Sequence, residues 1–264
     1  MNSLDSIRTS QVVEIPGWCG DVWKCELQRP SILALAARGA IANIERIDII
    51  TEESLPRVFS FDTASEASAE AQISAGAEKE LRIKNQILAQ NITVDIVKGF
   101  NISFTDSTFS PDVFALVDGG SSSVLSSGGG SMYLAPTAGQ VVSRTKCRLA
   151  VYTSEKDYDG NSLSFTAFIF PHASGSPASV KLKDGEFFAP SYTMKSRPSK
   201  GSSPMTVLSL PSLPVIVASA DDLPDSPVVG KTVILAAADG IQGLDADISS
   251  GTYAIYTQSG YSAV

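Results

Sequence analysis

The stretch FTDSTFSPDVFALVDGG, residues 104–120, places a short apolar helix between segments that have the pattern of β-strands. Ser110 suits the N-cap position, because its hydroxyl can accept a hydrogen bond from an unpaired amide of the first turn. Pro111 suits the first helical position, where no amide hydrogen is required. Gly119 can end the helix, since glycine adopts the left-handed conformation without a side-chain clash. These signals predict one helix of eight residues between Ser110 and Gly119.

The segments before this helix have the two-residue period of β-strands. In DIVKGFNISFTD, residues 95–106, large apolar residues fall on alternate positions, as at Phe100, Ile102 and Phe104. This is the pattern of a strand with one buried face. LRIKNQILAQN, residues 81–91, alternates in the same way but also contains good helix formers. We predict a half-buried strand there and keep a helix as the alternative.

The segments after the helix predict hairpins. GQVVSRTKCRLAVYTSE (residues 139–155) and NSLSFTAFIFP (161–171) read as two long strands joined at residues 159–160, an Asp-Gly pair. Such a pair favours a tight hairpin turn because it accepts positive φ. The run SSSVLSSGGGS, residues 121–131, predicts a flexible loop, because nothing in it enforces one conformation. Hairpins dominate, and the strand–helix alternation of a nucleotide-binding sheet is missing, so the predicted fold class is mostly β.

Changes in composition divide the chain into three parts. Residues 1–42 read as strand, strand and helix, a small α+β extension, and residues 43–213 form the main β domain. Residues 214–264 are predicted to be an acidic β appendage. From residue 205 onward one lysine stands against six aspartates, a net charge of −5 out of −8 for the whole chain. An acidic segment of this kind is usually a solvated surface.

The composition argues against several classes of function. The net charge of −8 and the pI near 4.7 make the chain a poor candidate for a nucleic-acid-binding protein. His172 is the only histidine, which argues against catalytic triads and histidine metal sites. Cys19, Cys25 and Cys147 are odd in number and lack metal-ligand spacing, so we expect reduced thiols in a cytosolic setting. We expect neither a signal peptide nor a membrane span, because no apolar run approaches roughly 18 residues.

Individual motifs add no convincing chemistry. Gly128–Ser131 could form a phosphate cradle but lacks the Lys and the strand-to-helix context of a P-loop, so a surface loop is the preferred interpretation. Asp157, Asp159 and Asn161 resemble an alternating calcium loop, but no glutamate closes it, and a hairpin turn is preferred. His172 could be a lone base, yet a structural role is favoured. We therefore predict no enzyme, no catalytic residues, no cofactor and no metal site.

Several stretches between about residues 43 and 213 resemble a tail tube protein of long-tailed bacteriophages. The resemblance rests on the order and spacing of IERIDIIT, FDTASEAS, ISAGAEKELRIKNQILAQN, DIVKGFNISFTDSTFSPDVFALVDGG, VVSRTKCRLAVYTSEKDYDGN, FIFPH and LKDGEFFAPSYTMKSRPSKG. It implies two packed antiparallel sheets, a β-sandwich or barrel, with one short flanking helix. It also implies a structural virion protein whose hexameric rings stack helically into a hollow tube for DNA ejection.

The same resemblance implies a location and a set of partners. The expected location is the virion tail, assembled in the host bacterial cytoplasm. The expected partners are further copies of the chain, the tape-measure protein and tail terminator or baseplate proteins, with transient, non-specific DNA contact and no membrane. Residues 1–42 separately resemble the start of a phage tail assembly chaperone, in EIPGWCGD, RPSILALAARG and IANIE. A tail assembly chaperone or tail adaptor that binds the tape-measure protein is therefore the alternative function.

The resemblance also gives the helix of residues 111–118 a candidate role in assembly. Its apolar sides could fill both the core of its own subunit and the seam with the next subunit. The expected interface residues are Phe109, Val113, Phe114, Leu116 and Val117. The Ser/Gly loop that follows could become ordered against an adjacent ring. The expected inter-ring residues are Ser121, Val124, Leu125 and Gly129.

Overall fold

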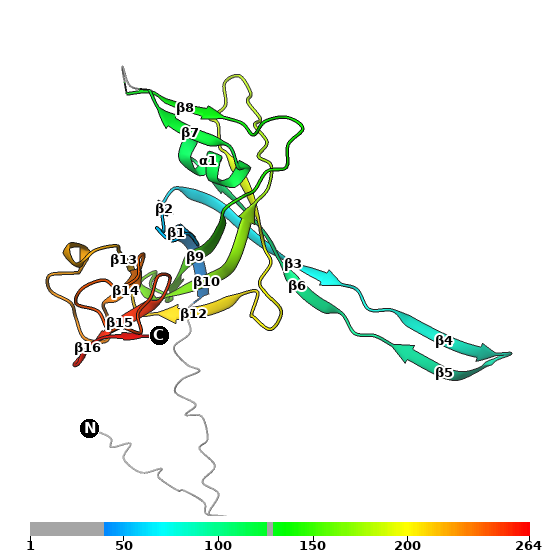
Figure 1. Cartoon of the computed structure of the whole chain (residues 1–264). Helices are drawn as coiled ribbons and strands as arrows, with labels where there is room; N and C mark the ends of the chain where they lie inside the picture. The colour runs from blue at the N-terminus through cyan, green and yellow to red at the C-terminus, as the bar shows by residue number, and fades with distance from the viewer. Residues whose placement is uncertain (1–39, 126–128) are drawn as a thin grey trace, which may run out of the picture. The chain divides into compact units, whose positions relative to one another are not determined.

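The computed structural model describes residues 40–125 and 129–264 (Figure 1). The compact unit described here lies within Gly39–Val264. The predicted strands and helix of the N-terminal extension lie outside the described residues, as do EIPGWCGD and RPSILALAARG of its resemblance to a chaperone. The third stretch of that resemblance, IANIE at residues 41–45, lies in β1.

This unit is built mainly from β-strands, with one short α-helix and one 3-10 turn. In chain order the elements are β1 (Ala40–Thr51), β2 (Val58–Phe61), β3 (Ala64–Ser74), β4 (Glu78–Ile83), β5 (Gln86–Ile92), β6 (Ile96–Asp106), α1 (Pro111–Asp118), β7 (Ser121–Val124), β8 (Ser131–Leu134), β9 (Lys146–Lys156), β10 (Ser162–Gly175), β11 (Ser191–Ser196), β12 (Thr206–Leu210), β13 (Val215–Val217), η2 (Ala220–Asp222), β14 (Val233–Ala236), β15 (Tyr253–Thr257) and β16 (Gly260–Ala263). The prediction of a mostly β protein with one short helix is confirmed.

The main sheet has eight antiparallel strands in the order β2-β1-β9-β10-β11-β6-β3, and β12 pairs with β10 beside this path. The long strand β10 can have both β12 and β11 as neighbours, because its first part pairs with β12 and its last three residues pair with β11. Strands β1 and β3 approach each other without pairing, so the sheet curls but does not close into a barrel. A closed barrel, one of the two predicted forms, is therefore absent among the described strands.

The central strands of the main sheet bury both of their faces. On one face, residues such as Ile49, Leu149 and Phe170 form the larger apolar core together with α1. On the other face, residues such as Ile50 and Ala150 pack against β14 and β15 of the four-stranded sheet β13-β14-β15-β16. The predicted packing of two sheets is thus present, although β13 and β14 pair in parallel.

Helix α1 forms where the sequence predicts it, but its first turn differs from the expectation. Ser110 has the extended N-cap conformation, yet its side chain makes no capping hydrogen bond, so that part of the prediction is wrong. Gly119 has φ 85° and donates its N–H to the carbonyl of Ala115 at 2.8 Å, as expected of a C-terminal glycine. Burial on β8, β10 and β11 stabilises so short a helix, because propensity alone cannot.

Two segments were misassigned from sequence. Residues 81–91 belong to the hairpin β4–β5, with Lys84 at φ 53° in its turn, and every residue of the two strands is exposed. The predicted half-buried single strand is therefore wrong, although strand was the right choice over helix.

Residues 121–131, predicted as a flexible loop, include β7 and the start of β8, which pair with each other. Backbone pairing beside α1 places residues 121–124 and 131–134 in strands, although the side-chain pattern gives no signal for them. The predicted turn at Asp159-Gly160 is confirmed between β9 and β10.

We predict that Gly175→Ala destabilises the protein by about 1–3 kcal/mol, the usual range for overpacking. A Cβ at Gly175 would lie 1.9 Å from the carbonyl oxygen of Val117, so α1 or β10 would have to move. The measurement is chemical denaturation with a matched Ser176→Ala control, which should shift stability by less than about 0.5 kcal/mol. Equal stability of Gly175→Ala and wild type would contradict the close packing of α1 on β10.

Candidate functional site

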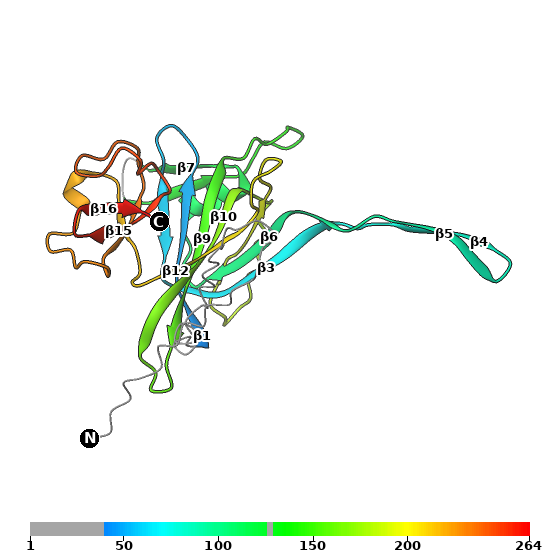
Figure 2. The same cartoon turned by 90° about the horizontal axis from the view of Figure 1, so that it is seen from below.

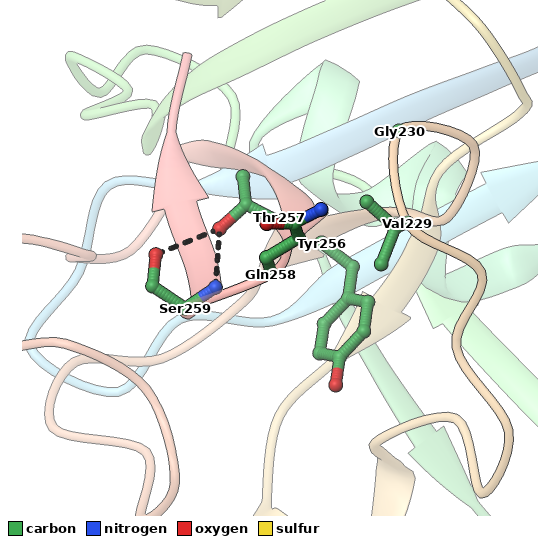
Figure 3. A pocket seen from close by; sticks show the side chains of 6 residues that line it. All are labelled: Val229, Gly230, Tyr256, Thr257, Gln258 and Ser259. Atoms are coloured by element: carbon green, nitrogen blue, oxygen red, sulfur yellow. Dashed lines mark hydrogen bonds between the residues drawn. The ribbon is translucent and has the colours of Figure 1, made fainter.

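Within the described residues, no group of three His, Cys, Asp or Glu side chains could hold a metal ion. An open depression of about 590 Å³ lies on the C-terminal sheet and is lined by uncharged residues (Figure 3). In its lining, the Thr257 hydroxyl lies 3.0 Å from the Ser259 hydroxyl and accepts the Ser259 N–H at 3.3 Å. The described ranges also contain no helix long and apolar enough to cross a bilayer.

His172, the candidate lone base, is held by Glu52. The Glu52 carboxylate lies 2.5 Å from Nδ1 of the ring and also accepts the His172 backbone N–H at 3.0 Å. His172 has φ 49° and sits where the register of β10 against β9 shifts between Phe170 and Ala173. This arrangement gives the histidine a structural task, which is to fix an irregular step of β10.

The candidate calcium loop is a hairpin turn. The Asp157 carboxylate accepts the backbone N–H of Asn161 at 2.7 Å and its side-chain amide at 3.1 Å. These hydrogen bonds, that of the Asn161 side chain first, lower the pKa of Asp157 below its usual value. The carboxylate oxygens are thus used within the turn, and the hairpin interpretation is confirmed.

The expected interface residues of the helix are mostly inside the subunit. Val113, Phe114, Leu116 and Val117 are buried in the core that α1 shares with the main sheet, whereas Phe109 is 47% exposed. The ring of Phe109 lies 5.6 Å from that of Phe114. The seam at this helix stays a prediction, and Phe109 is the member of the set with free surface for a second subunit.

The expected inter-ring residues lie on and beside the hairpin β7–β8. Val124 is 81% exposed and Leu125 is 49% exposed, while Ser121 pairs with Leu134 at the base of the hairpin. Gly129 is exposed and follows residues 126–128, which the structure does not describe. Apolar tips of this kind suit contact with another copy, and the inter-ring role stays a prediction.

Strand β3 is an unpaired edge that sequence reasoning did not single out. It is 11 residues long, pairs with β6 on one side only, and ends the strand order of the main sheet. Its sequence, ASEASAEAQIS, has no proline or lysine, the usual means of blocking an edge, and only two charges. A long open edge of this composition can pair with a strand of another chain. The low charge and small side chains of ASEASAEAQIS were the sequence signal from which this open edge could have been predicted.

Strands β3 and β6 continue beyond the sheet into the hairpin β4–β5, which leads away from the main sheet in both views (Figures 1 and 2). None of its residues is buried, although it carries five large aliphatic side chains that are 53–61% exposed: Leu81, Ile83, Ile87, Leu88 and Ile92. A two-stranded hairpin without a core is only marginally stable in water. Its exposed apolar side chains therefore form a candidate contact surface for another protein.

A buried polar cluster joins the main sheet to the C-terminal sheet. Asp48 has no exposed surface and accepts hydrogen bonds from Arg46 at 2.9 Å and from the Ser60 hydroxyl at 2.6 Å. Arg46 also donates to the carbonyl of Pro214 at 2.7 Å, at the start of the C-terminal part. The Tyr152 and Tyr253 hydroxyls lie 2.7 Å apart across the two sheets. The cluster therefore fixes the C-terminal sheet by directional bonds in addition to apolar contact.

Burial controls the protonation of this cluster. Desolvation raises the pKa of Asp48 above its usual value, and the Arg46 guanidinium and the Ser60 hydroxyl oppose the rise only in part. Burial likewise raises the pKa of Tyr253 to about 12. The phenols stay neutral at physiological pH, so they serve as hydrogen-bonding groups.

Comparison with known proteins gives distant structural similarity only. No protein-family model matches the sequence, and no curated protein matches it. Among solved structures, the chain is similar to a component of the anti-feeding prophage (AFP) baseplate, determined by cryo-EM with six-fold symmetry. The match covers 65% of this chain and 97% of that chain, with 11% identity and a TM-score of 0.34. Values this low do not assign the chain to a family.

We predict that Asp48 makes the folded protein less stable as pH rises. Its pKa is higher folded than unfolded, so the folded state binds the proton more tightly. Its contribution is present at and below pH 3.8 and is lost as pH rises through the folded-state pKa. Asp48→Asn should remove this slope from the free energy of unfolding, measured by denaturant titration between about pH 4 and 7.

The control for this experiment is Ser60→Ala, which keeps the carboxylate and removes one hydrogen bond that lowers the pKa of Asp48. It should keep or steepen the slope. If wild type and Asp48→Asn show the same pH dependence, the carboxylate is not the source.

Proposed function

We propose that this chain is a structural, non-enzymatic subunit of a phage-tail-like particle, namely a tail tube protein whose hexameric rings stack around a central channel for DNA. The observation that carries the proposal is a long open edge strand, β3, that continues into a hairpin with no buried residue. Both are surfaces that a further copy of the chain could cover. The sequence resemblance to tail tube proteins between about residues 43 and 213 supports the same function.

Ring closure would use the open edge of the main sheet. In a cyclic assembly each copy presents two different surfaces, one to each neighbour. The free edge of β3 supplies one of these surfaces, and pairing it removes a site that would otherwise invite uncontrolled association. Because the edge belongs to the largest sheet of the subunit, such pairing would continue the sheet from one subunit into the next.

The polar face of β11, β6 and β3 would line the channel. Ser103 of β6 lies beside Thr193 and Ser68, and the Ser68 and Ser103 hydroxyls are 2.8 Å apart. Glu66, Ser68 and Glu70 lie two positions apart along β3, so the two glutamates share the face of Ser68. Carboxylates repel a polyanion, and a ring of six chains carries 6 × −8 = −48 charges. DNA would slide past such a wall, whereas a basic wall would bind it.

The alternative is a tail assembly chaperone or tail adaptor that holds the tape-measure protein. The resemblance of residues 1–42 to the beginning of a tail assembly chaperone favours it. Negative-stain electron microscopy of the purified chain separates the two functions. Stacked rings with an open centre support the tube. A monomer that binds the tape-measure protein contradicts the tube and supports the alternative.

We predict that the double substitution Ala71→Lys/Ile73→Lys prevents ring formation. Ala71 is exposed and Ile73 is 52% exposed on the edge strand, so lysines there should leave the fold intact and repel a pairing strand. We expect at least about tenfold fewer rings than from the wild type at equal protein concentration.

The matched control is Ala218→Lys/Ala246→Lys, which adds the same charge at exposed positions of the C-terminal part. It should assemble like the wild type. Normal rings from the β3 variant would show that this edge does not close the ring.

A further inference from the structure

The larger apolar core is open at one end. A groove of about 330 Å³ lies on the concave side of the main sheet, with the buried side chains of Ile102 and Phe170 among its lining. Ile44 of β1, Phe100 of β6 and Phe168 of β10 are only partly buried around it. Helix α1 covers another part of the same core. Apolar side chains thus remain in water where a further apolar group would fit.

The hairpin β4–β5 supplies apolar side chains that lack a place in their own subunit. Leu81 and Leu88 are 57% and 58% exposed, and no residue of either strand is buried. Large exposed apolar patches rimmed by polar residues mark surfaces that contact another protein. The hairpin therefore has the chemistry that the groove accepts.

The hairpin cannot fill the groove of its own subunit. Ala67 of β3 and Phe100 of β6 belong to the groove lining, and the same two strands form the stem that leads the hairpin away (Figure 2). The β3–β6 pairing continues without a reversal to Ser74 and Ile96, so the hairpin does not fold back. An occupant with the chemistry of this hairpin has to come from a second copy.

Reach and charge are both compatible with a second copy. From Gly99, the last buried residue of β6 toward the hairpin, the extended chain to Asn85 spans about 45 Å, at about 3.3 Å for each residue. That is about the diameter of a domain of this size. Residues 78–92 contain three basic and two acidic side chains, a charge of +1, and the rest of the chain then carries −8 − 1 = −9. The charge of the hairpin therefore does not oppose its contact with another copy.

We propose that the groove formed by Ile44, Ala67, Phe100, Phe168 and Met205 is the receptor for the β4–β5 hairpin of a second copy. The contact is head-to-tail, because each subunit offers its hairpin to one neighbour and its groove to another, and such contacts generate rings or stacks. This inference rests on the proposed self-assembly and names the surface that receives the hairpin.

Photo-crosslinking tests the assignment in the assembled full-length protein. A benzophenone amino acid at position 88, which is exposed, is activated in rings checked by electron microscopy, and the crosslinked peptides are identified by mass spectrometry. We expect crosslinks between copies to peptides that contain Ile44, Phe100, Phe168 or Met205. The same probe at the exposed turn residue Tyr158 should not label these peptides.

The outcomes separate the two proposals. Rings whose position-88 crosslinks fall elsewhere, or that give none, overturn the groove while self-assembly stands. A chain that never assembles overturns both. Capture of a different protein in the groove, with intact rings, also overturns the assignment to a second copy.

A pair of hairpin variants gives an independent measurement. Leu81→Glu/Leu88→Glu should weaken association between copies by at least about tenfold, because it removes two apolar side chains from the contact and places carboxylates there instead. Asn85→Glu/Asn91→Glu adds the same charge to the same hairpin without removing apolar surface, and should change association by less than about threefold. Equal effects of the two variants would show that charge, and not burial in an apolar groove, governs the contact.

Discussion

The structure depends on burying both faces of the central strands of one curled sheet. Apolar residues of β1, β9 and β10 point in both directions, toward α1 on one side and toward the C-terminal sheet on the other. A strand with two apolar faces is stable only between two layers. The short helix and the small C-terminal sheet are therefore both required, and each is held by the core that it completes.

Burial decreases along the sheet from the centre toward the edge. Strand β9 is buried on both faces, β6 has one apolar and one polar face, β3 is mostly exposed, and β4–β5 has no buried residue. Folding of the single chain thus satisfies the centre and leaves the margin incomplete. This gradient is expected of a subunit whose stability as a monomer comes from one region and whose assembly uses another.

Two buried carboxylates lie where layers meet. Asp48 and Arg46 join the main sheet to the chain entering the C-terminal sheet. On the opposite side, Asp118 at the end of α1 accepts hydrogen bonds from Tyr133 and, at 2.9 Å, from the N–H of Ala178. Apolar burial is not directional, whereas these bonds fix position. They give each outer layer one orientation on the main sheet.

The sequence by itself determined the local elements that short-range physics controls. Pro111 and Gly119 set the bounds of the helix, Asp159-Gly160 set the β9–β10 turn, and two-residue alternation in residues 95–106 marked β6. Each signal concerns backbone conformation or one face of one element. It can therefore be read from the sequence without knowing which other element packs against it.

Only the tertiary structure decided which elements meet. The alternation of apolar residues in residues 81–91 predicts a half-buried strand, but no layer lies against this segment. The reason is that β3 and β6 run past the end of the main sheet before the chain forms the hairpin β4–β5. Four of the five expected seam residues are buried in the subunit's own core, and the seam with another subunit stays a prediction. The open edge of β3 and the groove depend on strand order, which follows from contacts distant in sequence that alternation alone does not encode.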